Sequence, residues 1–220
     1  MTTTKDAVLA LTETAAGEIA SSWAYNKRAK TFALTPVEGI TALLAPNWGF
    51  KSWIARTEPR LDLFSERVSS THRLLSGQRD AVAVLTLVNQ QFWRSCGQRG
   101  YPQSFMEDLA GYPATAGDRE ISDVPAYIQQ LTSCAEHYLS SGFDLGDEWQ
   151  FLRSCPKNWV YYSPFYRQDP RAFVLIQLLQ GNTQAMAQFL TQTDLPSEFR
   201  ESLMPTFAAY EANLAKLKLH

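Results

Sequence analysis

Apolar side chains recur every three or four residues along most of this 220-residue chain. This spacing places them on one face of an α-helix, because a helix completes a turn in about 3.6 residues. Five such stripes run through the sequence: Val8 to Trp23, Leu61 to Leu75, Ala81 to Phe92, Val124 to Tyr138, and Leu203 to Leu217. The stripes predict an all-α protein, an irregular multi-helix domain of about eight to ten helices rather than a simple four-helix bundle.

The most apolar segment is residues 171–179 (RAFVLIQLL). It is apolar on nearly every side, which predicts a central helix enclosed by its neighbours. A buried strand is the alternative interpretation of this run and of residues 81–88. Helical spacing continues on both sides of these runs, so we favour helices.

Signals for helix ends accompany the stripes. Residues 35–38 (TPVE) form a candidate capping box with proline at the first helical position. Ser122 or Asp123 can cap a helix that begins near Val124, and residues 169–170 (DP) can open the central helix. Five glycines lie where helices are expected to stop: Gly77, Gly97, Gly111, Gly142 and Gly181.

Three segments do not fit a helical pattern. Residues 46–58 and 156–166 are rich in aromatic residues and carry Pro or Gly breaks. Residues 111–122 form a polar loop. We expect a single helical domain over residues 1–220, with any weak division in the loop 111–122.

Composition indicates the compartment. With 45% hydrophobic residues, the chain has enough apolar side chains to fold around a core. No stretch approaches 18 consecutive apolar residues, and the first 20 residues lack a signal-peptide pattern. Three cysteines leave one unpaired in any disulfide scheme. These features predict a cytoplasmic protein in a reducing environment, without membrane association.

Charge is divided unevenly along the chain. Residues 1–100 carry 12 Lys/Arg and 8 Asp/Glu, whereas residues 101–220 carry 8 Lys/Arg and 14 Asp/Glu. The first part therefore has a net charge of +4 and the second −6. A surface polarised in this way can offer one side to an anion and another to a basic partner.

Short catalytic signatures are missing from the sequence. It contains no phosphate-binding glycine loop, no nucleophile elbow and no Cys-x-x-Cys or His-Glu-x-x-His pattern. Cys134 and His137 share a helical face and could bind a metal with Cys96 or Cys155, but a buried thiol beside an exposed histidine is the more common arrangement. We therefore predict no catalytic residue, no metal and no cofactor.

Basic and aromatic residues alternate in residues 22–60. Cations attract phosphates, and aromatic faces can stack on unpaired bases. The candidate residues for contact with nucleic acid or a partner are Lys27, Arg28, Lys30, Trp48, Lys51, Trp53 and Arg56. Alternatively, Trp23 belongs to the core and residues 27–30 end a helix.

The segment from Trp159 to Tyr166 is the second candidate region. It could line a ligand pocket, with His137 as a further polar group, or a partner groove, or it could form a loop over the central helix anchored by phenolic hydrogen bonds. The candidate pocket residues are Trp159, Tyr161, Tyr162, Tyr166 and Arg167.

These observations lead to three functional hypotheses. The first is a non-catalytic interaction subunit of a cytosolic assembly that handles RNA or DNA. Its basic N-terminal surface would meet phosphate, and its acidic residues 118–148 would meet a protein partner. The second is an enzyme or small-molecule-binding protein with its pocket near Trp159–Tyr166. The third is an adaptor that binds only protein.

Overall fold

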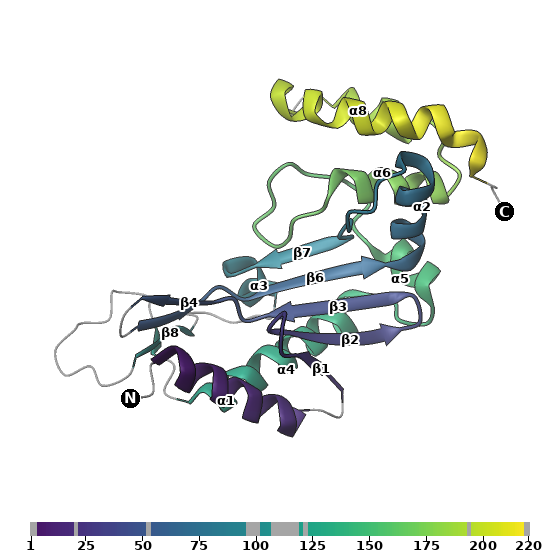
Figure 1. The fold of residues 1–220 in the computed structure, drawn as a ribbon. Helices are drawn as coiled ribbons and strands as arrows, with labels where there is room; N and C mark the ends of the chain where they lie inside the picture. Colours follow the sequence, from purple (N-terminus) through teal and green to yellow (C-terminus); the bar gives the residue numbers. More distant parts are fainter. Residues whose placement is uncertain are drawn as a thin grey trace.

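The computed structural model describes residues 4–19, 22–51, 54–95, 102–106, 119–120, 123–192 and 195–217. These residues form a mixed α/β fold: an antiparallel sheet with helices on both sides (Figure 1). The predicted all-α class is therefore wrong.

The central sheet has five antiparallel strands in the order β1-β2-β3-β6-β7. Buried and less buried residues alternate along β3 and β6, as a strand with one packed face requires. The strands are β1 (Ala24–Asn26), β2 (Thr31–Val37), β3 (Ile40–Ala45), β6 (Arg60–Ser65) and β7 (Leu85–Val88).

Strands β3 and β6 extend beyond the central sheet as β4 (Trp48–Lys51) and β5 (Ile54–Thr57). Ala45 pairs with Arg60 and Trp48 with Thr57, so the register is unchanged across the break. The intervening residues 46 and 59 are prolines, which have no N–H to donate. Beyond them, β8 (Pro102–Met106) and β9 (Arg119–Glu120) complete a second sheet.

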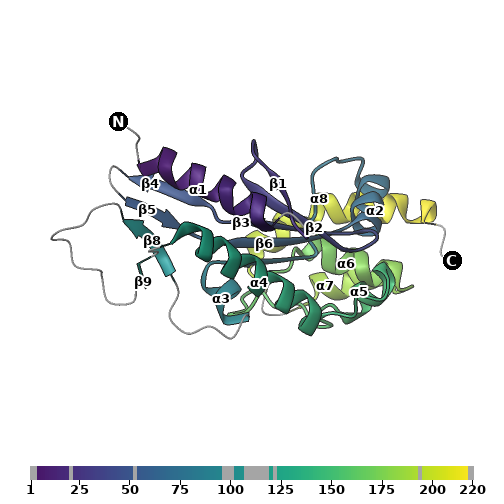
Figure 2. The ribbon, with the colours of Figure 1, turned by 90° about the horizontal axis from the view of Figure 1, so that it is seen from below.

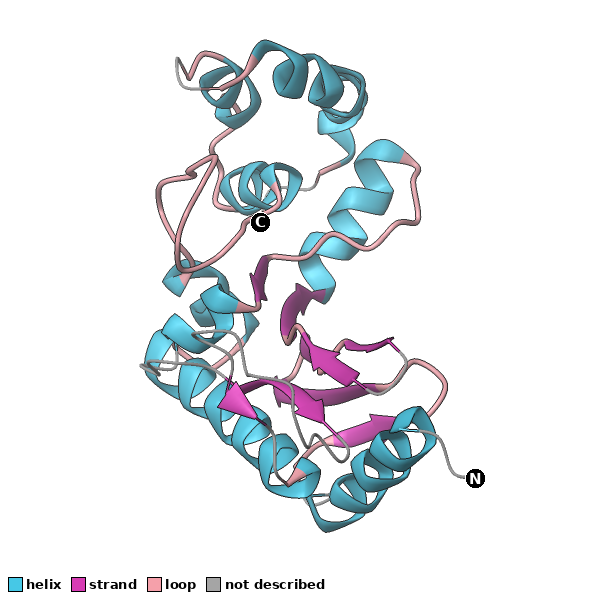
Figure 3. Ribbon diagram, turned by 90° about the vertical axis from the view of Figure 1, so that its left-hand side faces the viewer, coloured by secondary structure: helices cyan, strands magenta, loops and turns pink. Residues whose placement is uncertain are grey.

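The helices form two groups around the central sheet. Helices α1 (Thr4–Ile19) and α4 (Val124–Gly142) lie side by side along one face (Figures 1 and 2). A second group lies on the other side of the strands (Figure 3), where α2 packs against α6 and α8. The remaining helices are α2 (Glu66–Ser76), α3 (Gln90–Ser95), α5 (Glu148–Ser154), α6 (Pro170–Leu179), α7 (Ala185–Leu190), α8 (Ser197–Asn213) and the 3₁₀ turn η1 (Leu214–Lys216).

One hydrophobic core joins both halves of the chain. Its buried residues run from Val8 in α1 to Tyr210 in α8. Five residues of α6 are buried, so the prediction of a helix over residues 171–179 is confirmed. Among the helices that the structure describes, none is both long and apolar enough to cross a bilayer.

Two of the five predicted helical stripes cross boundaries between strands and helices. Leu61 belongs to β6, whereas Val68 and Leu75 belong to α2. Leu85 lies in β7, and Phe92 lies in α3. A strand followed directly by a helix produced spacings of three and four by coincidence, which is the physical reason for the wrong fold class.

The signals for helix ends had mixed outcomes. Asp123 caps α4, Asp169 caps α6, and Gly77 ends α2 in the left-handed conformation, all as predicted. The capping box at residues 35–38 is wrong, because this segment lies at the end of β2 and in the turn that follows it. Of the loop 111–122, the structure describes only Arg119 and Glu120, which form β9; Gly97 also lies outside the described residues.

Candidate functional site

The N-terminal basic residues are divided between two parts of the fold. Lys27, Arg28 and Lys30 lie in the exposed turn between β1 and β2, whereas Arg56 is exposed on β5 of the second sheet. Lys27 pairs with Glu13 of α1 at 2.7 Å, and this hydrogen bond raises the Lys27 pKa. The side chain of Lys51 and the whole of Trp53 lie outside the described residues.

The described aromatic rings near those cations pack in or against the core. Trp23 is buried, and its indole Nε1 donates to Glu136 of α4 at 2.9 Å. Phe32 is also buried, and the Trp48 ring lies 5.6 Å from that of Tyr127. Trp23 is therefore part of the core, as the alternative interpretation predicted.

Exposed aromatic side chains gather instead on residues 156–168, which we name the aromatic loop. It is the green segment between β7 and α6 (Figure 1). Tyr162 is 80% exposed, Phe165 54% and Tyr161 53%, and Val160 beside them is also exposed. Large aromatic side chains with this exposure are characteristic of protein-binding surfaces.

One end of the aromatic loop is held by Trp159, which is buried. Its indole Nε1 donates to the carbonyl oxygen of Gln168 at 3.0 Å, closing the loop on itself. The ring stacks on Phe199 of α8, with centroids 5.9 Å apart, and meets Phe189 of α7 edge-on. Tyr161 also contacts Phe199, edge-on at 5.2 Å.

Helix α3 and strand β7 hold the rest of the loop. Gln91 of α3 donates to the Ser163 carbonyl at 2.7 Å, and Ser95 donates to the Phe165 carbonyl at 3.1 Å. Arg167 exchanges two backbone hydrogen bonds with Thr86 of β7. Among the described residues, the loop is therefore anchored by the Trp159 indole, the Gln91 amide, the Ser95 hydroxyl and backbone groups, and not by the phenolic hydrogen bonds of the alternative interpretation.

Charge along this stretch of the sequence is one-sided. Residues 153–168 contain Arg153, Lys157 and Arg167 but no Asp or Glu. All three basic residues are exposed. The exposed aromatic side chains therefore lie in a positively charged stretch of chain.

A cavity of about 620 Å³ opens beside the aromatic loop. It contains one of the predicted pocket residues, Arg167; Trp159, Tyr161, Tyr162 and Tyr166 do not line it. Burial raises the pKa of Tyr166. The cavity is lined by Arg60, Phe64, Ala81, Ala83, Thr86, Val88, Arg167, Gln168, Asp169, Pro170, Arg171, Phe199 and Leu203.

Two arginines of this cavity are already paired. Arg60 Nε lies 2.7 Å from Asp62, and Arg171 bonds both Asp169 and Asp80. Asp169 contributes most to raising the Arg171 pKa. In the described part of the chain, the Arg167 guanidinium has no such carboxylate partner.

Gln168 is the residue that the sequence did not single out. It is 6% exposed and lines the cavity. Neither its amide nitrogen nor its amide oxygen has a hydrogen-bond partner among the described residues. No sequence signal indicates this, because the isolation of the amide arises from the packing of distant elements.

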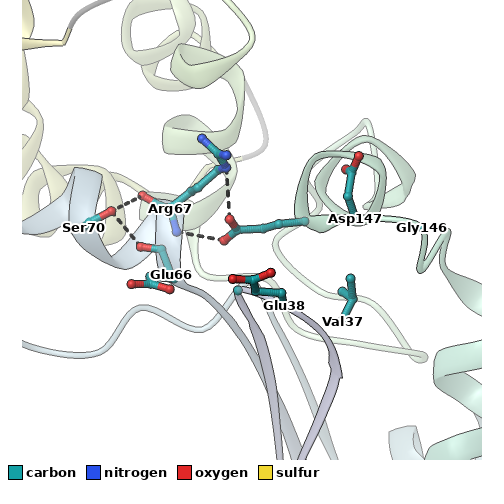
Figure 4. A pocket seen from close by; sticks show the side chains of 9 residues that line it. Val37, Glu38, Glu66, Arg67, Ser70, Gly146 and Asp147 are labelled. Carbon is teal, nitrogen blue, oxygen red and sulfur yellow. Dashed lines mark hydrogen bonds and ion pairs between the residues drawn. The ribbon is translucent and has the colours of Figure 1, made fainter.

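A second cavity, of about 600 Å³, lies where the β2–β3 turn meets α2 and α5. Figure 4 shows the acidic side chains of Glu38, Glu66 and Asp147 around it. Glu148 accepts hydrogen bonds from the Ser65 hydroxyl and the Arg67 backbone N–H, and pairs with Arg67 Nε at 3.0 Å. The Glu148 carboxylate thus accepts hydrogen bonds at the N-terminus of α2, so its role is structural.

Cys134 and His137, considered above for a metal site, lie as the more common arrangement predicts, with a buried thiol beside an exposed histidine. Cys134 is buried and His137 is exposed, while Cys96 lies outside the described residues. Burial raises the pKa of the Cys155 thiol to about 12. No three His, Cys, Asp or Glu side chains of the described residues gather in a way that could hold a metal ion.

Comparison of the chain with protein-family models, curated proteins and solved structures finds no match. Its function must therefore be argued from its own residues.

Proposed function

We propose that this chain is a non-catalytic interaction protein whose aromatic loop binds an acidic segment of a partner protein. The observation that carries the proposal is the contrast within this loop. Tyr162 and Phe165 are exposed, whereas Trp159 and Ser163 beside them are buried and hydrogen-bonded.

The anchoring supports binding because it lowers the entropy cost of association. A loop that is already ordered loses little conformational freedom when a partner covers it. The contacts with α3, β7, α7 and α8 hold the loop in this way. Tyr and Phe side chains presented on such a frame resemble the aromatic anchors that dominate binding energies.

Charge indicates the chemistry of the partner. Arg153, Lys157 and Arg167 accompany the exposed rings without an acidic residue between them. Complementary potentials favour an acidic partner segment and accelerate its encounter with this surface. The N-terminal basic residues offer less support for a nucleic-acid surface, because Trp23 and Phe32, which would stack on bases, are buried.

A cytosolic location remains part of the proposal. Among the described residues, Cys155 is a free thiol, which is the state that a reducing compartment maintains.

Site-directed photocrosslinking in the native cell tests the proposal. A photoreactive phenylalanine analogue replaces Tyr162, and a matched chain carries it at Leu74, which is 46% exposed on α2. We expect the first chain alone to crosslink a distinct protein, before and after nuclease treatment. The identified partner is then purified and its dissociation constant is measured.

Variants of the loop give the decisive comparison. Tyr162→Ser together with Phe165→Ser should weaken binding by about 100-fold, as loss of aromatic anchors does. The matched control, Leu74→Ser together with Met204→Ser, changes two similarly exposed apolar residues on α2 and α8 and should leave affinity unchanged. Equal effects of the two pairs, or crosslinks that require intact nucleic acid, would contradict the proposal.

A further inference from the structure

The cavity beside the aromatic loop has the size and composition of a ligand site. Its volume of about 620 Å³ lies within the usual range for small-molecule pockets, about 300–1,000 Å³. Strands β6 and β7 form one wall, and α6 and α8 form the opposite side. It therefore brings together elements that are distant in the sequence.

Of the three described arginines that line this cavity, two are paired with carboxylates and Arg167 is not. Arg60 is neutralised by Asp62, and Arg171 by Asp169 and Asp80. Among the described residues that line the cavity, Asp169 is the acidic one, and its carboxylate is bonded to Arg171 and caps α6. Arg167 is thus the exposed guanidinium left to bind an anion, and guanidinium binds a carboxylate with two parallel hydrogen bonds.

Gln168 is a second polar residue in the wall of the cavity. Its amide is buried in the cavity wall with two donors and an acceptor unused in the described part of the chain. A buried amide without partners is unfavourable unless a ligand or an ordered water completes it. Gln168 is therefore an unsatisfied polar residue in the wall of the cavity, among the residues that the structure describes.

The rest of the lining is apolar. Phe64, Val88, Phe199 and Leu203 supply most of it, together with two alanines, Ala81 and Ala83. Such a surface favours a hydrocarbon body rather than a sugar or a polyphosphate. Among the described residues that line the cavity, Arg167 is the cation without a carboxylate partner, which fits one negative charge.

We propose that this cavity binds a small monocarboxylic acid with an apolar body, its carboxylate on Arg167 and its body against Phe64, Val88 and Phe199. This site is distinct from the partner surface formed by Tyr162 and Phe165, which do not line the cavity. The two proposals therefore stand or fall separately.

Methyl NMR on the intact chain tests the site. Protein labelled at alanine and leucine methyl groups is titrated with acetate, butyrate, hexanoate and phenylacetate, and with the neutral amide of each, at constant ionic strength. We expect the Ala81, Ala83 and Leu203 methyl resonances to shift, and hexanoate to bind more tightly than acetate. Each acid should bind at least about tenfold more tightly than its amide, because the amide cannot pair with a guanidinium.

Three variants complete the design. Arg167→Ala should abolish the preference for acid over amide, and Arg28→Ala, which changes an exposed arginine in the β1–β2 turn, should change nothing. Tyr162→Ser together with Phe165→Ser should also leave acid binding intact. The proposal is overturned if no acid shifts these resonances, if acids and amides bind equally, or if Arg167→Ala retains the preference.

Discussion

At the scale of single residues, Gln168 is unusual because its buried amide has no partner in the described part of the protein. Gln168→Leu keeps a similar volume and removes the unsatisfied groups. We expect the free energy of unfolding to rise by about 1–3 kcal/mol, the cost of a buried polar group without a hydrogen bond. Urea denaturation measures this change. Gln78→Leu, at an exposed glutamine, should stay within about 0.5 kcal/mol of the wild type; similar gains in both variants would refute the explanation.

A hydrogen-bonded chain links three helices and the loop that carries Asp80 through the fully buried His72 of α2. His72 Nδ1 lies 2.6 Å from the Tyr210 hydroxyl of α8, and Nε2 lies 2.9 Å from the Asp80 carboxylate. Asp80 also pairs with Arg171 of α6. A hydrogen on Nε2 fits this arrangement, because the Asp80 carboxylate can only accept and the Tyr210 hydroxyl can donate to Nδ1.

The Asp80 carboxyl predicts an acid-dependent contribution to stability. The hydrogen bond from His72, and then the contact with Arg171, lower the Asp80 pKa from 3.8 to about 2. A lowered folded-state pKa stabilises the protein above the unfolded-state pKa, and this stability is lost as pH falls through the folded-state value. The contribution should therefore be complete above about pH 4 and disappear toward pH 2.

Asp80→Asn measures that contribution. We expect the variant to lose about 1 kcal/mol at pH 7, because the side chain is 48% exposed and solvent weakens its interactions. The difference from the wild type should shrink between about pH 4 and pH 2 in thermal unfolding. Glu201→Gln, an exposed carboxyl change on α8, is the control. A difference that persists unchanged at pH 2 would contradict the role of the carboxylate.

At the scale of elements, the β2–β3 turn is fitted closely to α5. Gly39 has a φ of 84°, and a Cβ atom there would lie 2.7 Å from the Glu148 carboxyl carbon. Gly39→Ala therefore combines backbone strain with displacement of the carboxylate that holds the α2 N-terminus. Gly77→Ala has a similar φ of 73° but open space around the Cβ position, so it isolates the strain.

We expect Gly77→Ala to destabilise by about 1 kcal/mol and Gly39→Ala by about 1–2 kcal/mol more. Gly17→Ala, inside α1 with open space around it, should instead stabilise by about 0.5–1 kcal/mol. Chemical denaturation of the three variants gives the order directly. Equal losses at Gly39 and Gly77 would show that contact with Glu148 contributes nothing.

Some elements could be predicted from sequence because their signals are local. The period of α4, the cap at Asp169 and the apolar run of α6 all lie within one segment. The sheet was missed for two reasons: β6 runs directly into α2, and β3 (ITALLA) lacks a clean alternation of polar and apolar residues. The alternation in β6 (RLDLFS) was the one clear strand signal, and the helical spacing of the following residues concealed it.

The candidate site, too, could be predicted only as far as its signals are local in the sequence. Its aromatic residues could be recognised in the segment 156–166, but which of them face solvent could not. Trp159 is buried because α7 and α8 supply Phe189 and Phe199, while Tyr162 has no such cover. Likewise, the free state of Arg167 depends on how Asp80 and Asp169 pair with Arg171.

At the scale of the whole molecule, the charge division along the chain does not separate two bodies. Helix α4, from the acidic part, packs beside α1, and Glu136 of α4 accepts hydrogen bonds from Trp23 and Ser22. Helices α6 and α8 pack on α2 in the same way. Each half of the sequence thus completes the core of the other.

This interleaving predicts that neither half folds alone. A chain divided within the loop 111–122 gives an N-terminal fragment without α4, α6 and α8, and a C-terminal fragment without the central sheet. Each fragment should show poorly dispersed NMR spectra, because most of its core positions would face water. Mixing the two should restore dispersed spectra and a single cooperative unfolding transition. Independent folding of either fragment would mean that the loop separates two domains, and that the contacts between α1 and α4 and between α2 and α8 stabilise an interface and not a common core.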